Sequence, residues 1–587
     1  HLAPRYDAVW YCWGADTTST FINCNGFALK VRKSLEPLLK TCLGRDLPLR
    51  PLWIDAICLN QENDREKAIQ VPLMAEVYKR ATRTIIWLGE PDDSTEDVML
   101  WIKSIPGAIK KVGIEKVDKL GFEKFGVEGF GEDRWHTEWQ RTREYLSRPW
   151  FQRLWTVQEV LLSWDVQIMC GTPIFPMVPW KDFCHFETAV RQVGGSQAVW
   201  PAATMAGHGS GLSQTLHYME LLRKMMIRYS SLPVSILKDV YQDRACHEPV
   251  DRIWGLLGLM RPELVAKVRE ANIIDYSEQA KREYWRSYIA FMEVVYAFDP
   301  EDFFILIFDD IGRGKTSPLP SWCIDFNAPR RYTSFQFSRK FRAGVTASGG
   351  QTAPRSSLDP ATCTLTVHGF LVDDVSQVTS EYTHRFSMET MAGDEDAYQI
   401  TAKELLLWLR ECYRLQDLSK YCGSSVESTK ALCSTLFGID GSKKARYSGD
   451  LPDAFPILER VMELYASGDV DNPGEATVSR LRQWSSFEDD WNSAIEHMTK
   501  LMATCNNRRM FVTRQGYIGL GPPDLQAGDK ICAFIGVGPL FALRQAENKA
   551  SGADRFTLVG DAYMYGMMFG EALNDAGRAP TRKFDII

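Results

Sequence analysis

With 587 residues, the chain is too long for a single hydrophobic core, and its length predicts about three or four domains. Its hydrophobic fraction of 45% and charged fraction of 24% are typical of a water-soluble globular protein. The net charge of −7 argues against a general binder of nucleic acids or anionic membranes. No apolar run approaches the ~20 residues that a membrane-spanning helix needs.

The 14 cysteines are scattered, without a CxxC pair or a Cys/His cluster at zinc spacing, so we expect no metal cofactor. No secretory signal is visible, which favours a cytoplasmic protein with reduced thiols. The chain begins with His1, and a targeting signal upstream of that residue would not be seen.

Residues 6–88 alternate short apolar strands with helices. Each strand ends at a polar or glycine-containing loop, and the second helix carries an inward stripe that includes Met74 and Tyr78. This β-α-β-α-β order predicts a flavodoxin-type parallel sheet with helices on both faces. The predicted elements are a strand at 6–13, a helix at 30–42, a strand at 52–55, a helix capped by Asn63 or Asp64, and strands at 84–88 and 165–170.

Parallel sheets of this kind bind ligands beyond the carboxyl ends of their strands. Three loops of this chain should converge there, at 13–18, 55–61 and 88–91. A helix over 147–162 begins at the same edge, after an inserted segment at 92–145 whose middle is rich in Gly and Lys. The topology therefore predicts that this helix contributes to the ligand crevice.

The 147–162 stretch is apolar on nearly every face, so its helix should be mostly buried. Ser147 is its predicted N-cap, and Pro149 lies in the first turn, where a missing N–H has no cost. Phe151, Trp155 and Glu159 stack on one face at four-residue intervals.

Glu159 is a carboxylate in a helix that should be buried. It must be paired, neutralised or opened to a cleft, because an isolated buried charge is very costly. One interpretation is a structural ion pair with Arg148 or Arg153. The other is a catalytic acid in a pocket lined by tryptophan.

The rest of the chain predicts a multidomain α+β protein. After the α/β domain at 1–175, residues 176–330 form a mainly helical middle, and 331–360 form a connector rich in Ser, Gly and Thr. Alternation at 361–380 and Gly-punctuated β structure at 508–575 predict a small discontinuous β domain, with 381–507 as a helical insertion. Within this middle region, the strongly apolar segment 303–308 has the length of a strand.

Two motifs suggest functions that other features argue against. Residues 309–316 end like a phosphate-binding loop, but Asp309 stands where Gly is needed, and Ser-Pro-Leu-Pro follows where a helix must begin. Residues 330–342 interleave cations with aromatic side chains, as a nucleic-acid platform does. The acidic overall charge favours a solvated edge with packed aromatics instead. These aromatics are Tyr332, Phe335, Phe337 and Phe341.

Several multi-residue motifs resemble the fungal heterokaryon-incompatibility (HET) domain. Residues 6–14 (Tyr-Asp-Ala-Val-Trp-Tyr-Cys-Trp-Gly) are similar to its opening, although Trp10-Tyr11-Cys12 replaces a more usual Ser-Tyr pair. Residues 53–61 (Trp-Ile-Asp-Ala-Ile-Cys-Leu-Asn-Gln) and 86–89 (Ile-Trp-Leu-Gly) resemble its central blocks. Residues 148–159 resemble its closing block. Further stretches common in HET proteins are 251–259, 320–322 and the glycine-rich end at 513–571.

The HET domain in turn resembles Toll/interleukin-receptor (TIR) domains. Tyr6-Asp7 at the start of the first strand, Ile54-Asp55 at the end of the second and Trp155-x-x-x-Glu159 after the third are similar to TIR landmarks. Some TIR domains hydrolyse NAD with a glutamate at the position of Glu159, and others only assemble and signal. The resemblance thus implies non-self recognition and cell-death signalling in fungal cells, with an allelic or non-allelic incompatibility protein as partner and with self-assembly.

Two hypotheses about mechanism follow from the resemblance. In the first, the domain is an NAD glycohydrolase in which Glu159 stabilises an oxocarbenium-like centre. Trp155 and Trp13 would line the pocket around the base of NAD. Residues of the three loops would bind the ribose or phosphate. These loop residues are Gly14, Asp16, Asp55, Gly89 and Glu90. In the second hypothesis, the domain is a recognition and assembly module without turnover.

Simpler structural roles also account for several of these residues. Trp13, Trp53 and Trp87 fit a hydrophobic core better than a ligand site, since large aromatics dominate protein cores. Asp55 could cap the loop that follows it. Glu66 lies in the first turn of its helix, where a carboxylate suits the helix dipole.

Overall fold

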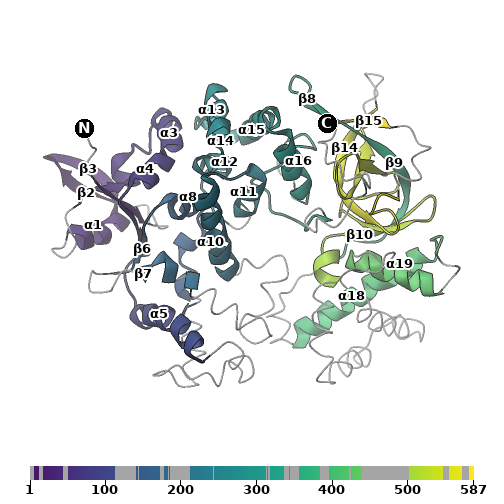
Figure 1. The fold of residues 1–587 in the computed structure, drawn as a ribbon, viewed down its shortest axis with the longest axis horizontal. Coiled ribbons are helices and arrows are strands. Elements are labelled where there is room, and N and C mark those ends of the chain that lie inside the picture. Colours follow the sequence, from purple (N-terminus) through teal and green to yellow (C-terminus); the bar gives the residue numbers. More distant parts are fainter. Residues whose placement is uncertain are drawn as a thin grey trace. The chain divides into compact units, whose positions relative to one another are not determined.

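The computed structural model describes most of the chain in two compact units, residues 1–204 with 210–294 and residues 205–209 with 295–587. Figure 1 shows the helices and strands of both units. The described residues are 5–11, 18–43, 50–112, 141–142, 144–171, 178–182, 184–185, 212–241, 244–312, 314, 318–335, 343, 356–383, 395–421, 423, 425–438, 501–546, 554–571 and 581–587.

The first unit is built on a five-stranded sheet in the order β4-β1-β5-β6-β7. The first four strands of this order run parallel, and β7 is antiparallel to β6. This arrangement confirms the predicted parallel sheet of the N-terminal region. The strands are β1 (Asp7–Tyr11), β4 (Leu52–Ile54), β5 (Arg83–Trp87), β6 (Val166–Met169) and β7 (Val178–Pro179).

Helices follow the strands as the sequence predicts. Asn63 caps α3, and its side-chain oxygen accepts hydrogen bonds from the backbone N–H groups of Arg65 and Glu66 at 3.1 Å each. The polypeptide turns through a short 3-10 helix and continues as α4, whose Met74 and Tyr78 are buried as expected. The helices are α1 (Glu36–Leu43), α2 (Asp55–Cys58), α3 (Asp64–Gln70), α4 (Met74–Arg80) and α5 (Thr95–Val112).

A β-hairpin, β2 (Ser19–Cys24) and β3 (Phe27–Arg32), was not predicted. The helix expected at 30–42 is therefore wrong at its start, since α-helical structure begins only at Glu36. Asn25 and Gly26 both have positive φ angles, 52° and 88°, as a type I′ hairpin turn requires. Ile22, Leu29 and Val31 pack into the same hydrophobic cluster as β1 and α1, which stabilises the hairpin face.

The continuous helix predicted over 147–162 is also wrong. A 3-10 turn covers Pro149–Gln152, and the α-helix α8 covers only Trp155–Leu162, with Leu154 rather than Ser147 at its N-cap position. Arg153 between them is extended (φ −83°, ψ 143°) and forms a β-bridge with Ala245. Pairing with a segment distant in the sequence thus replaces the helical hydrogen bonds at this point.

The middle region is helical where the structure describes it, as predicted. Residues up to 294 belong to the first unit, so the division falls within α15. The helices are α10 (Leu212–Tyr229), α11 (Val234–Tyr241), α12 (Asp251–Trp254), α13 (Pro262–Glu270), α14 (Glu278–Arg282) and α15 (Tyr284–Phe298).

The apolar segment at 303–308 is a helix, α16 (Pro300–Asp309), and not the strand that its length suggested. Asp299 accepts a hydrogen bond from the backbone N–H of Asp302 at 3.1 Å, and Pro300 occupies the first turn. These helix-start signals outweigh the short apolar run. Because a helix precedes residues 309–316, the strand that a phosphate-binding loop needs is also missing there.

Eight strands of the second unit form a sheet whose pairings close into a ring. The order is β10-β11-β14-β13-β12-β9, and β9 also pairs with β10, β8 and β15. All neighbours are antiparallel except β14 and β15. The strands are β8 (Ser356–Asp359), β9 (Thr364–Val378), β10 (Arg509–Thr513), β11 (Ile518–Gly521), β12 (Lys530–Phe534), β13 (Leu540–Gln545), β14 (Arg555–Met564) and β15 (Arg582–Ile586).

Two helices, α18 (Glu395–Gln416) and α19 (Ser425–Phe437), lie between β9 and β10 in the sequence. They pack against the sheet through a shared core that includes Trp408, Leu436 and Phe511. The helices predicted at 450–503 fall largely outside the described residues. The segment 331–360, predicted as a connector, contains β8 and packed residues at 332–335.

A buried ion pair joins residues 332–335 to the closed sheet. Arg508 and Asp561 are 1% and 0% exposed, and Arg508 Nη2 lies 3.0 Å from Asp561 Oδ1. The guanidinium lies over the rings of Tyr332 and Phe335, at 4.2 and 4.0 Å from their centroids. Of the predicted aromatic platform, these two residues are therefore packed, while Phe337 and Phe341 lie outside the described residues.

Candidate functional site

Glu159 lies near the middle of α8. Figure 1 shows this helix between the parallel sheet and the helices α10 and α12. Every residue of α8 from Thr156 to Leu162 is buried, because α4 and α10 both pack against this helix. Glu159 itself is only 2% exposed. Its carboxyl group is therefore in the protein core and not at an open surface.

Burial raises the pKa of Glu159 well above its ordinary value. Arg153 opposes this shift, as do the nearby Trp150 indole and Tyr78 hydroxyl, whereas Asp55 raises the pKa further. Burial has the largest effect, so the folded protein disfavours the charged form of this carboxyl. The Trp150 indole and the Tyr78 hydroxyl are near enough to lower the pKa of Glu159, although Glu159 Oε2 and Trp150 Nε1 meet no partner at hydrogen-bonding geometry among the described residues.

Glu159, Arg148 and Arg153 all belong to the described residues, and neither arginine forms an ion pair with Glu159. Arg148 pairs with Asp92 at 2.8 Å and donates to the carbonyl oxygens of Leu88 and Glu90 at 3.1 and 3.3 Å. Arg153 lies over the ring of Trp10, 5.1 Å from its centroid. Glu159 thus forms no direct ion pair with either arginine, although the charge of Arg153 lowers its pKa.

The predicted substrate-binding residues that the structure describes have different neighbours. Asp55 begins α2 and is close enough to Glu159 to influence its pKa. Gly89 and Glu90 instead lie beside Arg148, since a Cβ added at Gly89 would be 3.7 Å from Arg148 Nη1 and the Glu90 carbonyl accepts a hydrogen bond from that nitrogen. Trp13, Gly14 and Asp16 lie outside the described residues. Of the other tryptophans, Trp87 is buried in the core, as expected, and Trp53 contacts Tyr78 edge-to-face.

Trp155 contacts the middle region. Its indole N–H donates to Asp251 Oδ2 at 3.2 Å, and the Tyr276 hydroxyl donates to the other carboxylate oxygen at 2.7 Å. Asp251 is 7% exposed, and burial raises its pKa to about 6. Sequence reasoning noted the 251–259 stretch but did not place it beside α8, because the two segments are distant in the sequence.

We expect Glu159→Gln to change the free energy of unfolding at pH 7 by less than about 1 kcal/mol. Gln has the size of the protonated carboxylic acid that the raised pKa of Glu159 favours. Glu159→Lys should instead cost more than about 3 kcal/mol, because it buries an unpaired cation near Arg153. Urea titrations of the two variants test this. An equally large loss for Gln would show that Glu159 is ionised in the folded protein.

The raised pKa of Asp251 predicts a pH-dependent stability. The folded state binds a proton at about pH 6, whereas the unfolded state binds it near pH 3.8. This contribution to stability is therefore present at low pH and is lost as the pH rises through 6. The free energy of unfolding should fall by about 1 kcal/mol more between pH 5 and pH 7 in the wild type than in Asp251→Asn. Identical pH profiles would contradict the prediction.

In the described part of the chain, no three His, Cys, Asp or Glu side chains are arranged to hold a metal ion. None of the helices found there combines the length and the apolar character needed to cross a bilayer.

Comparison with known families gives two matches. Residues 6–159 match the family described as "Heterokaryon incompatibility protein (HET)", and residues 443–584 match the "Het-6 beta-barrel domain". The chain is similar to "Heterokaryon incompatibility protein 6, OR allele" of Neurospora crassa, at 23% identity over 655 positions that cover 98% of this chain and 91% of the relative. No solved structure matches the chain. These findings support a heterokaryon-incompatibility protein, with a HET domain near one end and a Het-6-type β domain near the other.

Proposed function

We propose that the chain is a non-self-recognition protein that signals cell death by binding an incompatibility partner and assembling. Its N-terminal unit would be a TIR-like assembly domain, and it would act in the cytoplasm. The family matches support the recognition role. The state of Glu159 supports a mechanism without substrate turnover.

The argument from Glu159 is electrostatic. Stabilising an oxocarbenium-like centre requires a charged carboxylate that the substrate can reach. Glu159 is 2% exposed and its pKa is raised by burial, so its charged form is disfavoured and the group is covered. In this conformation it is a packed core residue.

A second candidate function is NAD glycohydrolysis in an opened conformation. The polar groups gathered around Glu159 favour it, because Trp150, Tyr78 and Asp55 all influence its pKa, and buried carboxyl groups with shifted pKa values cluster at functional sites. Movement of α8 would expose Glu159 as the catalytic group. Trp155 and Trp13 would then line the pocket around the base of NAD. The ribose or phosphate would be bound by the loop residues Gly14, Asp16, Asp55, Gly89 and Glu90.

One experiment separates the two candidates. Purified full-length protein is incubated with NAD, with and without a clustering agent, and nicotinamide release is followed beside Glu159→Gln. We expect no release from either protein. Release from the wild type that is lost in Glu159→Gln, a variant expected to fold normally, would replace the assembly mechanism by the enzymatic one.

The recognition role is tested in cells. Fungal strains that express the full-length chain are fused with a panel of wild isolates and with a sister strain. Growth arrest should follow fusion with some isolates and not with the sister strain, and Glu159→Gln should behave like the wild type. Absence of arrest with every isolate would count against the recognition role.

A further inference from the structure

The hairpin of β2 and β3 has two free strand edges. Among the described residues, these strands pair only with each other and form a sheet of their own. One face of the hairpin packs into the core through Ile22, Leu29 and Val31, whereas the Phe21 side chain on the other face is 68% exposed. A two-stranded hairpin is only marginally stable, and a free edge is a template on which another strand can pair.

The pairing pattern shows which backbone groups face the free edge of β2. The carbonyl oxygen of Thr18 accepts a hydrogen bond from the backbone N–H of Lys33 at 3.0 Å, so every second residue from position 18 onward bonds across the hairpin. The N–H and C=O groups of Ser19, Phe21 and Asn23 therefore point away from β3. In the described part of the chain, these outward groups have no backbone partner.

The two edges of the hairpin differ in charge. Strand β2 (Ser-Thr-Phe-Ile-Asn-Cys) has no charged residue, whereas Lys30 and Arg32 lie in β3 at positions whose backbone groups face the opposite edge. Natural proteins protect free strand edges with charged side chains, above all with Lys. Two β3 edges paired about Lys30 would also bring cations directly opposite each other, which is destabilising. The β3 edge is therefore protected against self-pairing, and the β2 edge is not.

The sequence of β2 is complementary to a second copy of itself. An antiparallel pair of β2 strands with a twofold axis at Phe21 puts Phe21 opposite Phe21 of the second copy, and Ser19 opposite Asn23. All three residues with outward backbone groups then have a partner, with aromatic against aromatic and small polar against small polar. Any other register of the same kind leaves some of these groups beyond the end of the partner strand.

We propose that the β2 edge is the surface through which two copies of this chain pair, joining their hairpins into one continuous antiparallel sheet. This inference rests on the proposed assembly function and names the surface that carries it. Each copy contributes the 6 residues of β2, fewer than the about 20–30 residues a side of a standard interface, so the pairing should be weak and concentration-dependent. Clustering of copies by a bound partner would therefore favour assembly.

Sedimentation equilibrium of the full-length chain over a range of micromolar concentrations measures the pairing. Phe21→Lys removes the aromatic pair at the twofold axis and sets cations opposite each other, so it should weaken the pairing at least about tenfold. Because the side chain of Phe21 is 68% exposed, the variant should fold like the wild type.

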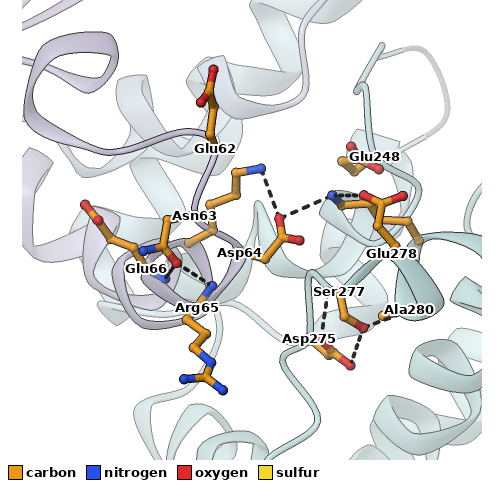
Figure 2. Close-up of polar contacts among 12 residues, drawn as sticks. Glu62, Asn63, Asp64, Arg65, Glu66, Glu248, Asp275, Ser277, Glu278 and Ala280 are labelled. Atoms are coloured by element: carbon orange, nitrogen blue, oxygen red, sulfur yellow. Dashed lines mark hydrogen bonds and ion pairs between the residues drawn. The ribbon is translucent and has the colours of Figure 1, made fainter. Parts of the chain in front are cut away.

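Two control variants match the apolar area and the charge of this substitution. Phe27→Ser removes a ring that is 78% exposed on β3, beside the hairpin turn and away from the β2 edge. Glu278→Gln raises the net charge by one unit, as Phe21→Lys does, but on α14, where Glu278 pairs with Lys281 at 2.8 Å (Figure 2). Both controls should associate like the wild type.

Disulfide formation tests the register. In the proposed pair, residue 21 lies opposite itself, with Cα atoms about 5.5 Å apart, which is within the span of a disulfide. Residue 19 lies opposite residue 23, so its two copies are more than about 10 Å apart. Mild oxidation by dissolved oxygen should therefore link Phe21→Cys into a covalent dimer, while Ser19→Cys links only as much as the wild type.

A wild type that stays monomeric over this concentration range would overturn the pairing, as would a Phe21→Lys variant that associates as strongly as the wild type. Equal linking of Phe21→Cys and Ser19→Cys would also overturn it, because the strands would then not share the proposed register. Growth arrest after fusion tests the proposed function separately. Arrest with a monomeric wild type refutes only the pairing, and paired protein without arrest refutes only the cell-death role.

Discussion

Asp561→Ala is expected to destabilise the C-terminal unit by about 3–5 kcal/mol, because it leaves a buried guanidinium without its counter-charge. Arg508 is 1% exposed and has Asp561 as its ion-pair partner. The same carboxylate accepts hydrogen bonds from the Ser334 hydroxyl, at 3.0 Å, and from the backbone N–H of Phe335. The substitution thus removes three polar contacts at once from a site that water does not reach.

Hydrogen exchange of β14 and β9 as a function of urea measures the effect on this unit. Asp554→Ala is the control, since Asp554 is exposed at the start of the same strand segment. Replacing both partners, as in Arg508→Met with Asp561→Leu, should cost less than the sum of the single changes. A loss below about 1 kcal/mol for Asp561→Ala would mean that the pair is not a main support of the unit.

The second large effect is expected from truncation. A fragment of residues 1–175 should not fold cooperatively, whereas residues 1–294 should. The family match ends at residue 159, inside α8, yet α8 is covered by α10 and contacted by Gly258, whose backbone N–H donates to Gln158. Further contacts reach α3 and the turn before α4, through Lys281 with Asp64 and Arg269 with the carbonyl of Pro72. Without these helices, a large apolar face would be open to water.

Thermal unfolding followed by circular dichroism distinguishes the fragments. Residues 1–294 should give one cooperative transition, and residues 1–175 should give a broad, weak change or precipitate. A cooperative transition of the short fragment at a similar temperature would show that the HET-matched region is an independent domain.

Local signals explain why the parallel sheet could be predicted. Short apolar strands such as the one ending at Ile54 are followed by polar loops, and the Asn63 cap marks a helix start that depends only on neighbouring residues. The hairpin was missed although Asn25-Gly26 is a strong turn signal. Its strands are largely exposed, so they lack the continuous apolar run by which the other strands were recognised.

Contacts between distant residues explain the remaining errors. The break at Arg153 depends on Ala245, and no pattern within 147–162 shows it. Contacts between distant residues also limit what the sequence predicts about the candidate site. Glu159 could be singled out as a carboxylate in an apolar helix, but its raised pKa follows mainly from burial, which only the fold produces.

The closed ring of the second unit has a consequence for the order in which this chain is made and folded. Strand β9 leaves the ribosome before most of the strands with which it pairs. Apart from β8, all of its partner strands follow residue 508. Pairing over such sequence distances is slow, and unpaired strand edges promote aggregation. During synthesis, β9 must therefore wait while α18 and α19 are added, and its unpaired edges are open to aggregation during that interval.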